Sequence, residues 1–322
     1  MTNQQILERI PKLRALVVGD VCLDRWCRYD PALADPSRET GIPRTAVVSS
    51  EVTPGAAGTI ANNLKSLGCQ VALMGAIGDD GNGFELRRAL RLRGISGEFV
   101  FASEQIPTFT YTKLINLRTG VEDLPRVDFV ATRPLPSAIE KQLVDLFESA
   151  FRGFDVIFVS DQAETAHGGT VTAPLRELME RVAPQFPEKV FVVDSRARIH
   201  LFRNVILKPN ETEAEAGSTA LLGRVDFSAM RAALRAPVLI VTRDARGASL
   251  FEESCSTDVP GVAVGTPVDI CGAGDSFSAG FGLAHAVTRD AKRSAQFGNL
   301  IASITIMKPG TGTASPEEVL AG

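Results

Sequence analysis

The amino-acid sequence predicts an open, doubly wound α/β fold with a mostly parallel sheet. Short apolar runs of strand-forming residues begin at Ala15, Val71, Asp155, Lys189, Asn204 and Pro237. Most of the segments between these runs have the period and length of helices, as residues 137–151 do. Strands that alternate with helices in this way are typical of βαβ units, whose parallel strands are buried on both faces.

The composition favours a protein that acts on a small molecule. The chain has 322 residues, of which 44% are hydrophobic, and this is enough to bury a large core. Its formal net charge of -4 gives no basic footprint for nucleic acid or for an anionic membrane. We therefore expect neither of these as a partner.

The cysteines and the N-terminal segment predict a soluble, cytoplasmic protein. The five cysteines are scattered and form no CxxC pair, so neither a disulfide framework nor a zinc site is expected. The first residues lack the long apolar core of a signal peptide, and no run approaches the roughly 18 apolar residues of a membrane span.

Two stretches interrupt the alternation of strands and helices. Residues 22–52 are rich in turn residues, and residues 98–130 contain TFTYTKLINL, whose polar and apolar residues alternate as in a strand. No internal repeat or linker divides the chain. The sequence therefore predicts a single domain over residues 1–322, with a small β-lid formed by residues 22–52 and 98–130.

Polar residues follow most of the predicted strands. In an open α/β sheet, ligands bind beyond the carboxyl ends of the strands, so these residues would form the rim of a crevice. Any one of them could instead cap the helix that follows it, but together they indicate a site. They are Asp20, Asp79, Asp80, Asp161, Asp194, Asn210 and Thr242.

The segment VDICGAGDSFSAGFG, residues 268–282, indicates a phosphate site at the start of a helix. Gly272, Ala273 and Gly274 would let backbone amides point together at a helix N-terminus, which attracts anions. Asp275 would face that anion, where a carboxylate could accept a proton from a hydroxyl that attacks phosphorus. The alternative interpretation is a simple helix cap on a glycine turn.

Three further segments could take part in the same site. Asn210 and Glu213, in KPNETEAE, could hold hydrated magnesium through water, or they could form a capping box. Asp24 follows the first strand, where a carboxylate could bind sugar hydroxyls. Residues 53–63, TPGAAGTIANN, begin a helix with small residues that let the backbone approach a ligand, although tight packing explains them equally well.

These segments, in this order and over nearly the whole chain, resemble the PfkB or ribokinase family of ATP-dependent carbohydrate kinases. DICGAGDSF resembles the C-terminal signature of that family, and NETE resembles its N-x-x-E motif. GDVCLDRW, YTKLI, RVDF and PGTGTASPEE are most similar to the heptose 7-phosphate kinase branch, the kinase domain of a bifunctional heptose enzyme. The resemblance implies a ribokinase-like, Rossmann-type α/β/α domain of three layers, with the sugar under a β-lid and ATP across the sheet edge.

The resemblance also implies a role for each matching residue, with ATP, Mg²⁺ and, as in some members, K⁺ as cofactors. Asp275 would be the catalytic base, and Gly272, Ala273 and Gly274 would form the anion hole. Lys113 and Arg126 would reach the substrate or its phosphate, unless they simply lie on a solvated face of the lid. The other substrate-binding residues would be Asp24, Gly55, Thr59, Asn63 and Asp161. The nucleotide and metal region would comprise Asn210, Glu213, Thr242, Gly247 and Asn299, with Asp269 near a monovalent-cation site.

Two departures from the family pattern concern the sugar and leave the phosphoryl-transfer residues untouched. The paired glycine and following asparagine of the family appear here as Gly55-Ala56 and Thr59, so a sugar-binding amide is lost or shortened to a hydroxyl. Glu164 stands where the heptose branch has a lysine. Both changes weaken the assignment of a heptose phosphate as substrate.

The leading hypothesis is therefore a kinase that transfers a phosphoryl group from ATP to a hydroxyl of a sugar or sugar phosphate. The resemblance implies a homodimer through the lid, whose sheet edges would otherwise be exposed. The alternatives are a nucleoside kinase and a non-catalytic sensor of sugar or nucleotide on the same fold. The sequence contains no GxxxxGK[ST] loop and no G-x-S-x-G elbow, which argues against other common chemistries.

Overall fold

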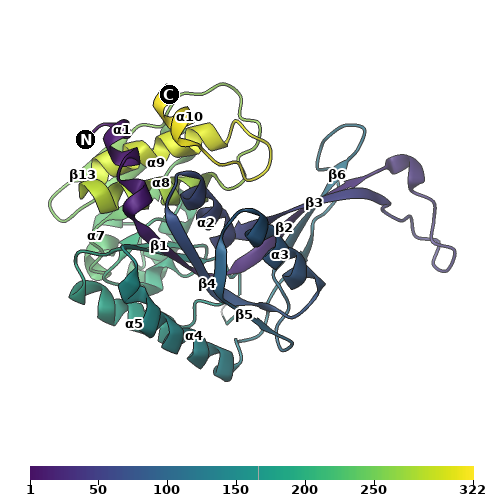
Figure 1. Ribbon diagram of the computed structural model, residues 1–322, viewed down its shortest axis with the longest axis horizontal. Coiled ribbons are helices and arrows are strands. Elements are labelled where there is room, and N and C mark those ends of the chain that lie inside the picture. The colour runs from purple at the N-terminus through teal and green to yellow at the C-terminus, as the bar shows by residue number, and fades with distance from the viewer. Residues whose placement is uncertain (166) are drawn as a thin grey trace.

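The computed structural model describes residues 1–165 and 167–322, and in this part of the chain a nine-stranded sheet forms the centre (Figure 1). Its strand order is β13-β12-β11-β10-β9-β8-β1-β4-β5; the strands from β11 to β5 are parallel, β12 is antiparallel to β11, and β13 is antiparallel to β12. The strands are β1 (Arg14–Gly19), β4 (Gln70–Gly78), β5 (Ser96–Ser103), β8 (Val156–Asp161), β9 (Val190–Ser195), β10 (Ile206–Leu207), β11 (Leu239–Thr242), β12 (Ala248–Phe251) and β13 (Ser256–Val259).

The runs predicted from the sequence are confirmed as β1, β4 and β8 to β11, neighbours in the parallel part of the sheet. Their apolar residues alternate between two cores. Leu16 and Val18 of β1 belong to one core, and Ala15 and Val17 belong to the other. A strand that is apolar at every position is therefore buried on both faces.

Helices cover both faces of the sheet, which gives the predicted α/β/α layers (Figure 1). One face is covered by α2 (Ala57–Ser66), α3 (Gly81–Leu92), α8 (Ala273–Thr288) and α9 (Ala291–Thr305), together with α1 (Asn3–Leu7) and α10 (Pro316–Ala321). The other face is covered by α4 (Ser137–Ala150), α5 (Ala173–Val182), α6 (Glu211–Leu222) and α7 (Phe227–Ala233). Within the described residues, no helix is both long and apolar enough to span a bilayer.

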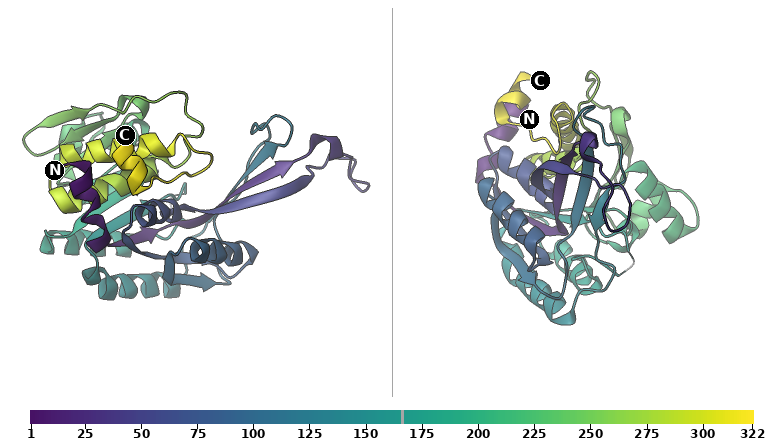
Figure 2. Two further views of the ribbon diagram at one scale, coloured as in Figure 1. Left: turned by 45° about the horizontal axis from the view of Figure 1, so that its top comes forward. Right: turned by 90° about the vertical axis from the view of Figure 1, so that its right-hand side faces the viewer.

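A second sheet has the order β3-β2-β6-β7. It consists of β2 (Val21–Tyr29), β3 (Val47–Ala56), β6 (Thr110–Asn116) and β7 (Val127–Phe129). The far ends of β2 and β3 extend away from the main body of the protein (Figure 2). The near ends of these strands follow β1 and precede α2, so they lie beside the carboxyl edge of the main sheet.

The range expected for the lid is wrong at one end. Residues 98–103 belong to β5, the edge strand that pairs in parallel with β4 in the main sheet. The reason is the continuous apolar run FVFA: Val100 is buried in one core, while Phe99 and Phe101 pack against the other. A strand with apolar residues on both faces fits the three-layer body better than a sheet with one exposed face.

Helix α8 lies very close to the main sheet because glycine occupies its contact positions. A Cβ atom added at Gly282 would come within 2.4 Å of the Phe158 ring on β8, and one at Gly280 would come within 2.8 Å of Ile301 on α9. Asp275 stands about two turns earlier on the same helix. The closeness of this packing therefore determines where the Asp275 carboxylate lies.

We expect Gly282→Ala to lower the free energy of unfolding by about 1–3 kcal/mol, because the added methyl group overpacks the contact with Phe158. Urea unfolding followed by circular dichroism measures the change. Gly81→Ala is the control, since nothing lies within 4 Å of a Cβ at that position. Equal stability of the Gly282→Ala variant and the wild type would show that α8 can move away from the sheet without cost.

Candidate active site

A cavity of about 150 Å³ lies between the second sheet and the carboxyl edge of the main sheet. The second sheet contributes Asp24 and Trp26 from β2, Tyr111 and Lys113 from β6, and Arg126 just before β7. The remaining lining residues are Ala56, Thr59, Gln162, Arg196, Cys271, Gly272, Asp275 and Thr311. The cavity thus brings together the predicted site residues Asp24, Thr59, Lys113, Arg126, Gly272 and Asp275.

The glycine turn before α8 contains backbone amides without a carbonyl partner among the described residues, and its residue Gly272 lines this cavity. Gly272 has a φ of 78°, in the left-handed region that glycine adopts without strain, and the helix begins at the next residue. The Ala273 amide donates to the Ile270 carbonyl at 3.2 Å. In the described part of the chain, no backbone carbonyl accepts from the amides of Gly272 and Gly274. These two amides can therefore bind an anion, whereas the Ala273 amide is engaged in the turn.

Asp275 is partly buried beside these amides, and its acidity is strongly perturbed. Burial raises the pKa of the Asp275 carboxyl to about 8, and the negative charges of Asp194 and Asp24 act in the same direction. Lys208 and Arg196 oppose this shift. A carboxyl group with a pKa near neutrality holds its proton firmly enough to act as a general base.

Lys208 lies directly against the glycine turn before α8. Its Nζ atom would be 3.3 Å from a Cβ at Gly274, and it forms a buried ion pair with Asp194 at 2.7 Å. Burial lowers the pKa of Lys208, but the Asp194 carboxylate outweighs this effect and the net shift is upward. The ammonium therefore stays charged beside Asp275.

Asp24 requires glycine at position 55. A Cβ at Gly55 would lie 2.5 Å from Cγ of Asp24, so only glycine leaves room for the carboxylate. Burial raises the pKa of Asp24 to about 6, against the positive charges of Lys113 and Arg126. Gly55 therefore acts through Asp24, because the cavity-lining residues do not include it.

Two residues of α2, Thr59 and Asn63, are expected to bind substrate, and only Thr59 lines the cavity. The Thr59 side chain reaches the cavity, although its hydroxyl donates to the Pro54 carbonyl at 3.3 Å. Asn63 lies one turn further along the helix, where it is buried and donates to the Thr59 carbonyl at 3.0 Å. Asn63 is not among the residues that line the cavity, and its buried Oδ1 atom has no hydrogen-bond partner in the described part of the chain.

Ala56 adopts a strained backbone conformation at the cavity wall. It caps the N-terminus of α2 with φ 51° and ψ -116°, a combination that is common only for glycine. Alanine therefore stands at a position whose backbone conformation glycine would adopt without strain. The methyl group of Ala56 lines the cavity.

The Asn210 and Glu213 side chains form a capping box at the start of α6. The Asn210 Oδ1 atom accepts from the Glu213 amide, and Glu213 Oε2 accepts from the Asn210 amide, both at 2.9 Å. Among the described residues, none donates a hydrogen bond to the second carboxylate oxygen of Glu213. Burial and the nearby Asp194 charge raise the pKa of Glu213, so a cation here would relieve both effects.

The remaining residues expected in the nucleotide region are held by backbone contacts. The Thr242 hydroxyl donates to Pro209 at 3.4 Å, and the Asn299 amide donates to Pro260 at 2.9 Å. Gly247, with a φ of 91°, allows close contact with Val259 and Gly261. None of the three lines the cavity described above. Asn299 is buried, so its side chain positions the segment after β13.

Asp269 joins the loop before α8 to the loop after α9. Its carboxylate accepts from the Cys271 amide at 2.9 Å and from the Gly310 amide at 3.1 Å. The next residue, Thr311, lies 3.3 Å from the Thr53 hydroxyl on β3. The glycine turn before α8 is therefore linked through one loop to the second sheet.

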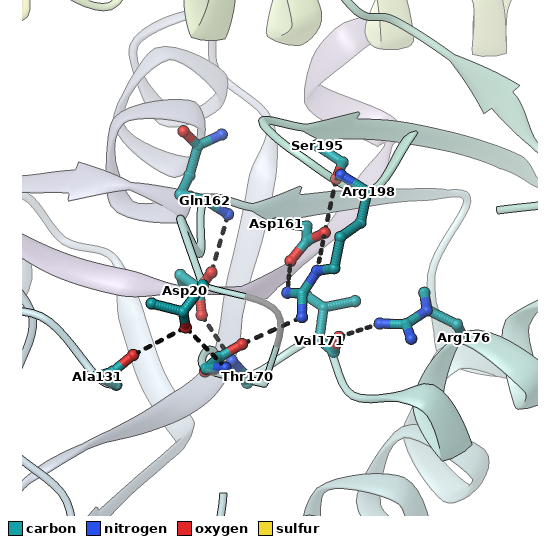
Figure 3. A network of polar contacts seen from close by, with 11 residues as sticks. Asp20, Ala131, Asp161, Gln162, Thr170, Val171, Arg176, Ser195 and Arg198 are labelled. Carbon is teal, nitrogen blue, oxygen red and sulfur yellow. Dashed lines mark hydrogen bonds and ion pairs between the residues drawn. The ribbon is translucent and has the colours of Figure 1, made fainter. Parts of the chain in front are cut away.

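Asp161 is expected to bind substrate, and the structure places it outside the residues that line the cavity. Its carboxylate is buried with no exposed surface, pairs with Arg198 through both oxygens, and accepts from the Ser195 hydroxyl at 2.6 Å (Figure 3). The Asp161 side chain does not belong to the lining of the cavity, and three hydrogen bonds hold its carboxylate in the interior. The position at a strand end was predicted correctly, but the side chain stabilises the neighbouring loop.

Several cavity residues were not predicted from the sequence. Tyr111 could have been found, because it stands two residues before Lys113 on β6 and so faces the same side of the sheet. Arg196 follows the end of β9 in a loop without a recognisable motif, and Gln162 directly follows the last residue of β8. Their approach to the cavity depends on contacts between loops that are far apart in the sequence.

Comparison with known proteins agrees with this geometry. The model of the pfkB family of carbohydrate kinases matches residues 14–318. The Bifunctional protein HldE of Trichlorobacter lovleyi is 30% identical over 329 residues, which cover 99% of this chain and 64% of that protein. The chain therefore spans less than two thirds of the length of this curated relative.

Solved structures share the fold at lower sequence identity. A ribokinase from Thermotoga maritima superposes with a TM-score of 0.71 at 21% identity and covers 96% of this chain and 98% of its own. A ribokinase from Arabidopsis thaliana complexed with ribose and ATP has a TM-score of 0.68 at 17% identity, with 96% of this chain and 98% of its own covered.

The strain at Ala56 gives a testable prediction. We expect Ala56→Gly to raise the free energy of unfolding by about 1 kcal/mol, because glycine adopts this backbone conformation without the Cβ clash. Thermal unfolding measures the shift. Ala57→Gly is the matched control: its residue is helical, so the substitution should lower stability by about the same amount. A lower melting temperature for Ala56→Gly would contradict the assignment of strain.

Proposed function

This chain belongs to the pfkB family of carbohydrate kinases, and from that premise we propose that it transfers a phosphoryl group from ATP to a hydroxyl of a sugar or sugar phosphate. The acceptor would bind in the cavity beside Asp275. The observation that carries the proposal is the pKa of Asp275, raised to about 8 next to the free amides of Gly272 and Gly274. A proton acceptor beside an anion site is what an attacking hydroxyl requires.

In the proposed reaction, the acceptor hydroxyl donates its hydrogen bond to Asp275. The carboxylate takes the proton while the hydroxyl oxygen attacks the γ-phosphorus of ATP, the bond from that phosphorus to the bridging oxygen breaks, and ADP leaves. The amides at the start of α8 would stabilise the negative charge on the transferring group. Asp24 would accept from a neighbouring hydroxyl and so orient the sugar. The second sheet covers the cavity from the other side and would exclude water from it.

Kinases of this family use ATP with a divalent metal, and we propose that this metal is Mg²⁺. We also propose that the protein acts in the cytoplasm. The free oxygen of Glu213 would hold the metal, through water, together with Asn210 at the start of α6. When bound, Mg²⁺ would neutralise charge on the nucleotide phosphates. A monovalent cation such as K⁺ beside Asp269 is part of the same proposal.

We also propose a homodimer that forms through the second sheet. β3 and β7 are the edge strands of this sheet, and Val127 and Phe129 of β7 are 52% and 50% exposed. Ile42 and Val121, in the loops at the far end of the sheet, are 66% and 56% exposed. Unpaired strand edges beside exposed apolar side chains favour association with a second copy of this sheet.

The general-base role of Asp275 predicts a large loss of activity in Asp275→Asn. We expect kcat/KM to fall by at least about 100-fold, because general-base catalysis contributes about 10² to 10⁴ in rate. In the wild type, kcat/KM should rise with pH and level off above about pH 8, where Asp275 is ionised. ADP release from a panel of sugars, sugar phosphates and adenosine measures both, and near-normal turnover in Asp275→Asn would contradict the assignment.

The stability of the same variant serves as its control. The folded protein holds the Asp275 proton up to about pH 8, whereas the unfolded chain loses it near pH 4, so Asp275 lowers stability progressively as pH rises between these values. Asp275→Asn should therefore unfold at a higher temperature than the wild type at pH 8. An inactive but less stable variant would indicate damage to the fold.

The dimer proposal predicts that charge at the β7 edge produces monomers. Val127→Lys combined with Phe129→Lys places like charges from two copies against each other, and we expect the mass in solution to fall from dimer to monomer. Size-exclusion chromatography with light scattering measures it. Phe84→Lys is the control, because Phe84 is 67% exposed on α3, outside the second sheet. A wild-type monomer at micromolar concentration would overturn the proposal.

A further inference from the structure

The cations that line the cavity come from two different parts of the protein. Among the described residues, Lys113 lies on β6 and Arg126 just before β7, so both belong to the second sheet. Arg196 follows the end of β9, at the carboxyl edge of the main sheet. In the described lining, Arg196 is therefore the one cation that the main body contributes, together with Gly272 and Asp275.

The backbone of Arg196 is fixed to the end of the neighbouring strand. Its amide donates to the carbonyl of Asp161, the last residue of β8, at 3.0 Å. The Ser195 hydroxyl donates to the Asp161 carboxylate at 2.6 Å and accepts from the Arg198 amide at 3.0 Å. Arg198 also pairs with both oxygens of that carboxylate (Figure 3). The residues on both sides of Arg196 are therefore anchored, and its side chain starts from a rigid turn.

The guanidinium of Arg196 is held by a residue that stands outside the cavity. Its Nη1 atom donates to Oε1 of Glu164 at 2.5 Å, and Glu164 does not belong to the lining. In the described part of the chain, no residue accepts from the remaining side-chain N–H groups of Arg196. An arginine oriented in this way offers a planar set of donors to a ligand in the cavity.

The charge of Arg196 reaches the carboxyl groups at the starts of two helices. Burial raises the pKa of Asp275 at the start of α8 and that of Glu213 at the start of α6, and Arg196 opposes both shifts. Asp275 is the proposed base beside the acceptor, and Glu213 belongs to the proposed metal and nucleotide region. Arg196 therefore lies close to the path between the nucleotide phosphates and the acceptor.

We infer that Arg196 is a catalytic residue that binds the phosphoryl group while it passes from ATP to the acceptor. The inference rests on the proposed function and adds a residue to it. The acceptor oxygen forms its bond to the γ-phosphorus, the bond from that phosphorus to the bridging oxygen of ADP breaks, and Asp275 takes the proton of the acceptor hydroxyl. Arg196 keeps its own protons and donates hydrogen bonds to the oxygens of the group in transfer.

The chemistry of phosphoryl transfer explains why an arginine suits this position. Negative charge is spread over the three equatorial oxygens of the group in transfer, while the attacking and leaving oxygens lie in line with phosphorus. The planar fork of a guanidinium can bind two of these oxygens at once, whereas the ammonium of a lysine acts as a single point of charge. Arg196→Lys therefore separates the geometry of the side chain from its charge.

The test distinguishes binding of the group in transfer from binding of either substrate. ADP release gives kcat and KM for the wild type, Arg196→Met and Arg196→Lys, with the sugar or sugar phosphate of the panel that the wild type turns over best. Calorimetry with Mg²⁺ present measures the affinity for ADP alone and for ADP with aluminium fluoride and that acceptor, which imitates the group in transfer.

A surface arginine provides the matched control. Arg181→Met is suitable because Arg181 is 63% exposed on α5 and pairs with Glu148 at 3.2 Å, away from the lining of the cavity. Thermal unfolding accompanies each variant, and Arg196→Lys carries the comparison if Arg196→Met proves unstable.

We expect kcat to fall by about 100- to 1,000-fold in Arg196→Met, with the KM for the acceptor and the affinity for ADP within about twofold of the wild type. The affinity for the complex with aluminium fluoride should fall by a similar factor. Arg196→Lys should recover only part of the loss, and Arg181→Met should match the wild type.

Two results would overturn the inference and leave the kinase assignment standing. One is a near-normal kcat in Arg196→Met, and the other is a raised KM for the acceptor at unchanged kcat, which would place Arg196 on the bound acceptor instead. If the wild type releases no ADP with any acceptor of the panel, the proposed function fails, and this inference fails with it.

Discussion

The close contact between α8 and the main sheet is the constraint on which the site depends. The helix can lie against Phe158 only because Gly282 has no side chain there, and Gly280 allows α9 to approach the same helix. This packing determines the position of the N-terminus of α8 relative to the cavity. The free amides and the Asp275 carboxylate then stand beside each other on one rigid element, which keeps their geometry fixed during a reaction.

The same placement explains why Asp275 is so weakly acidic. A carboxyl group removed from water and set near Asp194 and Asp24 loses part of the stabilisation of its charged form, and Lys208 restores only some of it. A protein pays for such a group in stability, because the folded state must tolerate a charge that water would solvate better. Burial of the Asp275 carboxyl group near other carboxylates therefore both raises its pKa and lowers the stability of the protein.

Much of the fold could be predicted from the sequence, because its physical signals are local. The strands are apolar at consecutive positions, and the glycine turn before Asp275 has a short, recognisable pattern. The contacts of the Asp161 and Asn63 side chains were harder to predict. The position of a residue at a strand end or on a helix does not determine which neighbours form hydrogen bonds with its side chain. Arg196 had no local signal: only the folded arrangement places the loop after β9 beside the loop after β8.

The buried pair of Asp161 and Arg198 has a consequence for protein engineering. If either residue is replaced alone, the other is left as an unpaired charge in the interior, which destabilises a protein more than the pair stabilises it. Arg198 also holds the Gly168 carbonyl, so the segment between β8 and α5 is anchored by a residue that follows β9. The segment between β8 and α5 therefore cannot be exchanged on its own. A graft from a relative would have to carry both loops together.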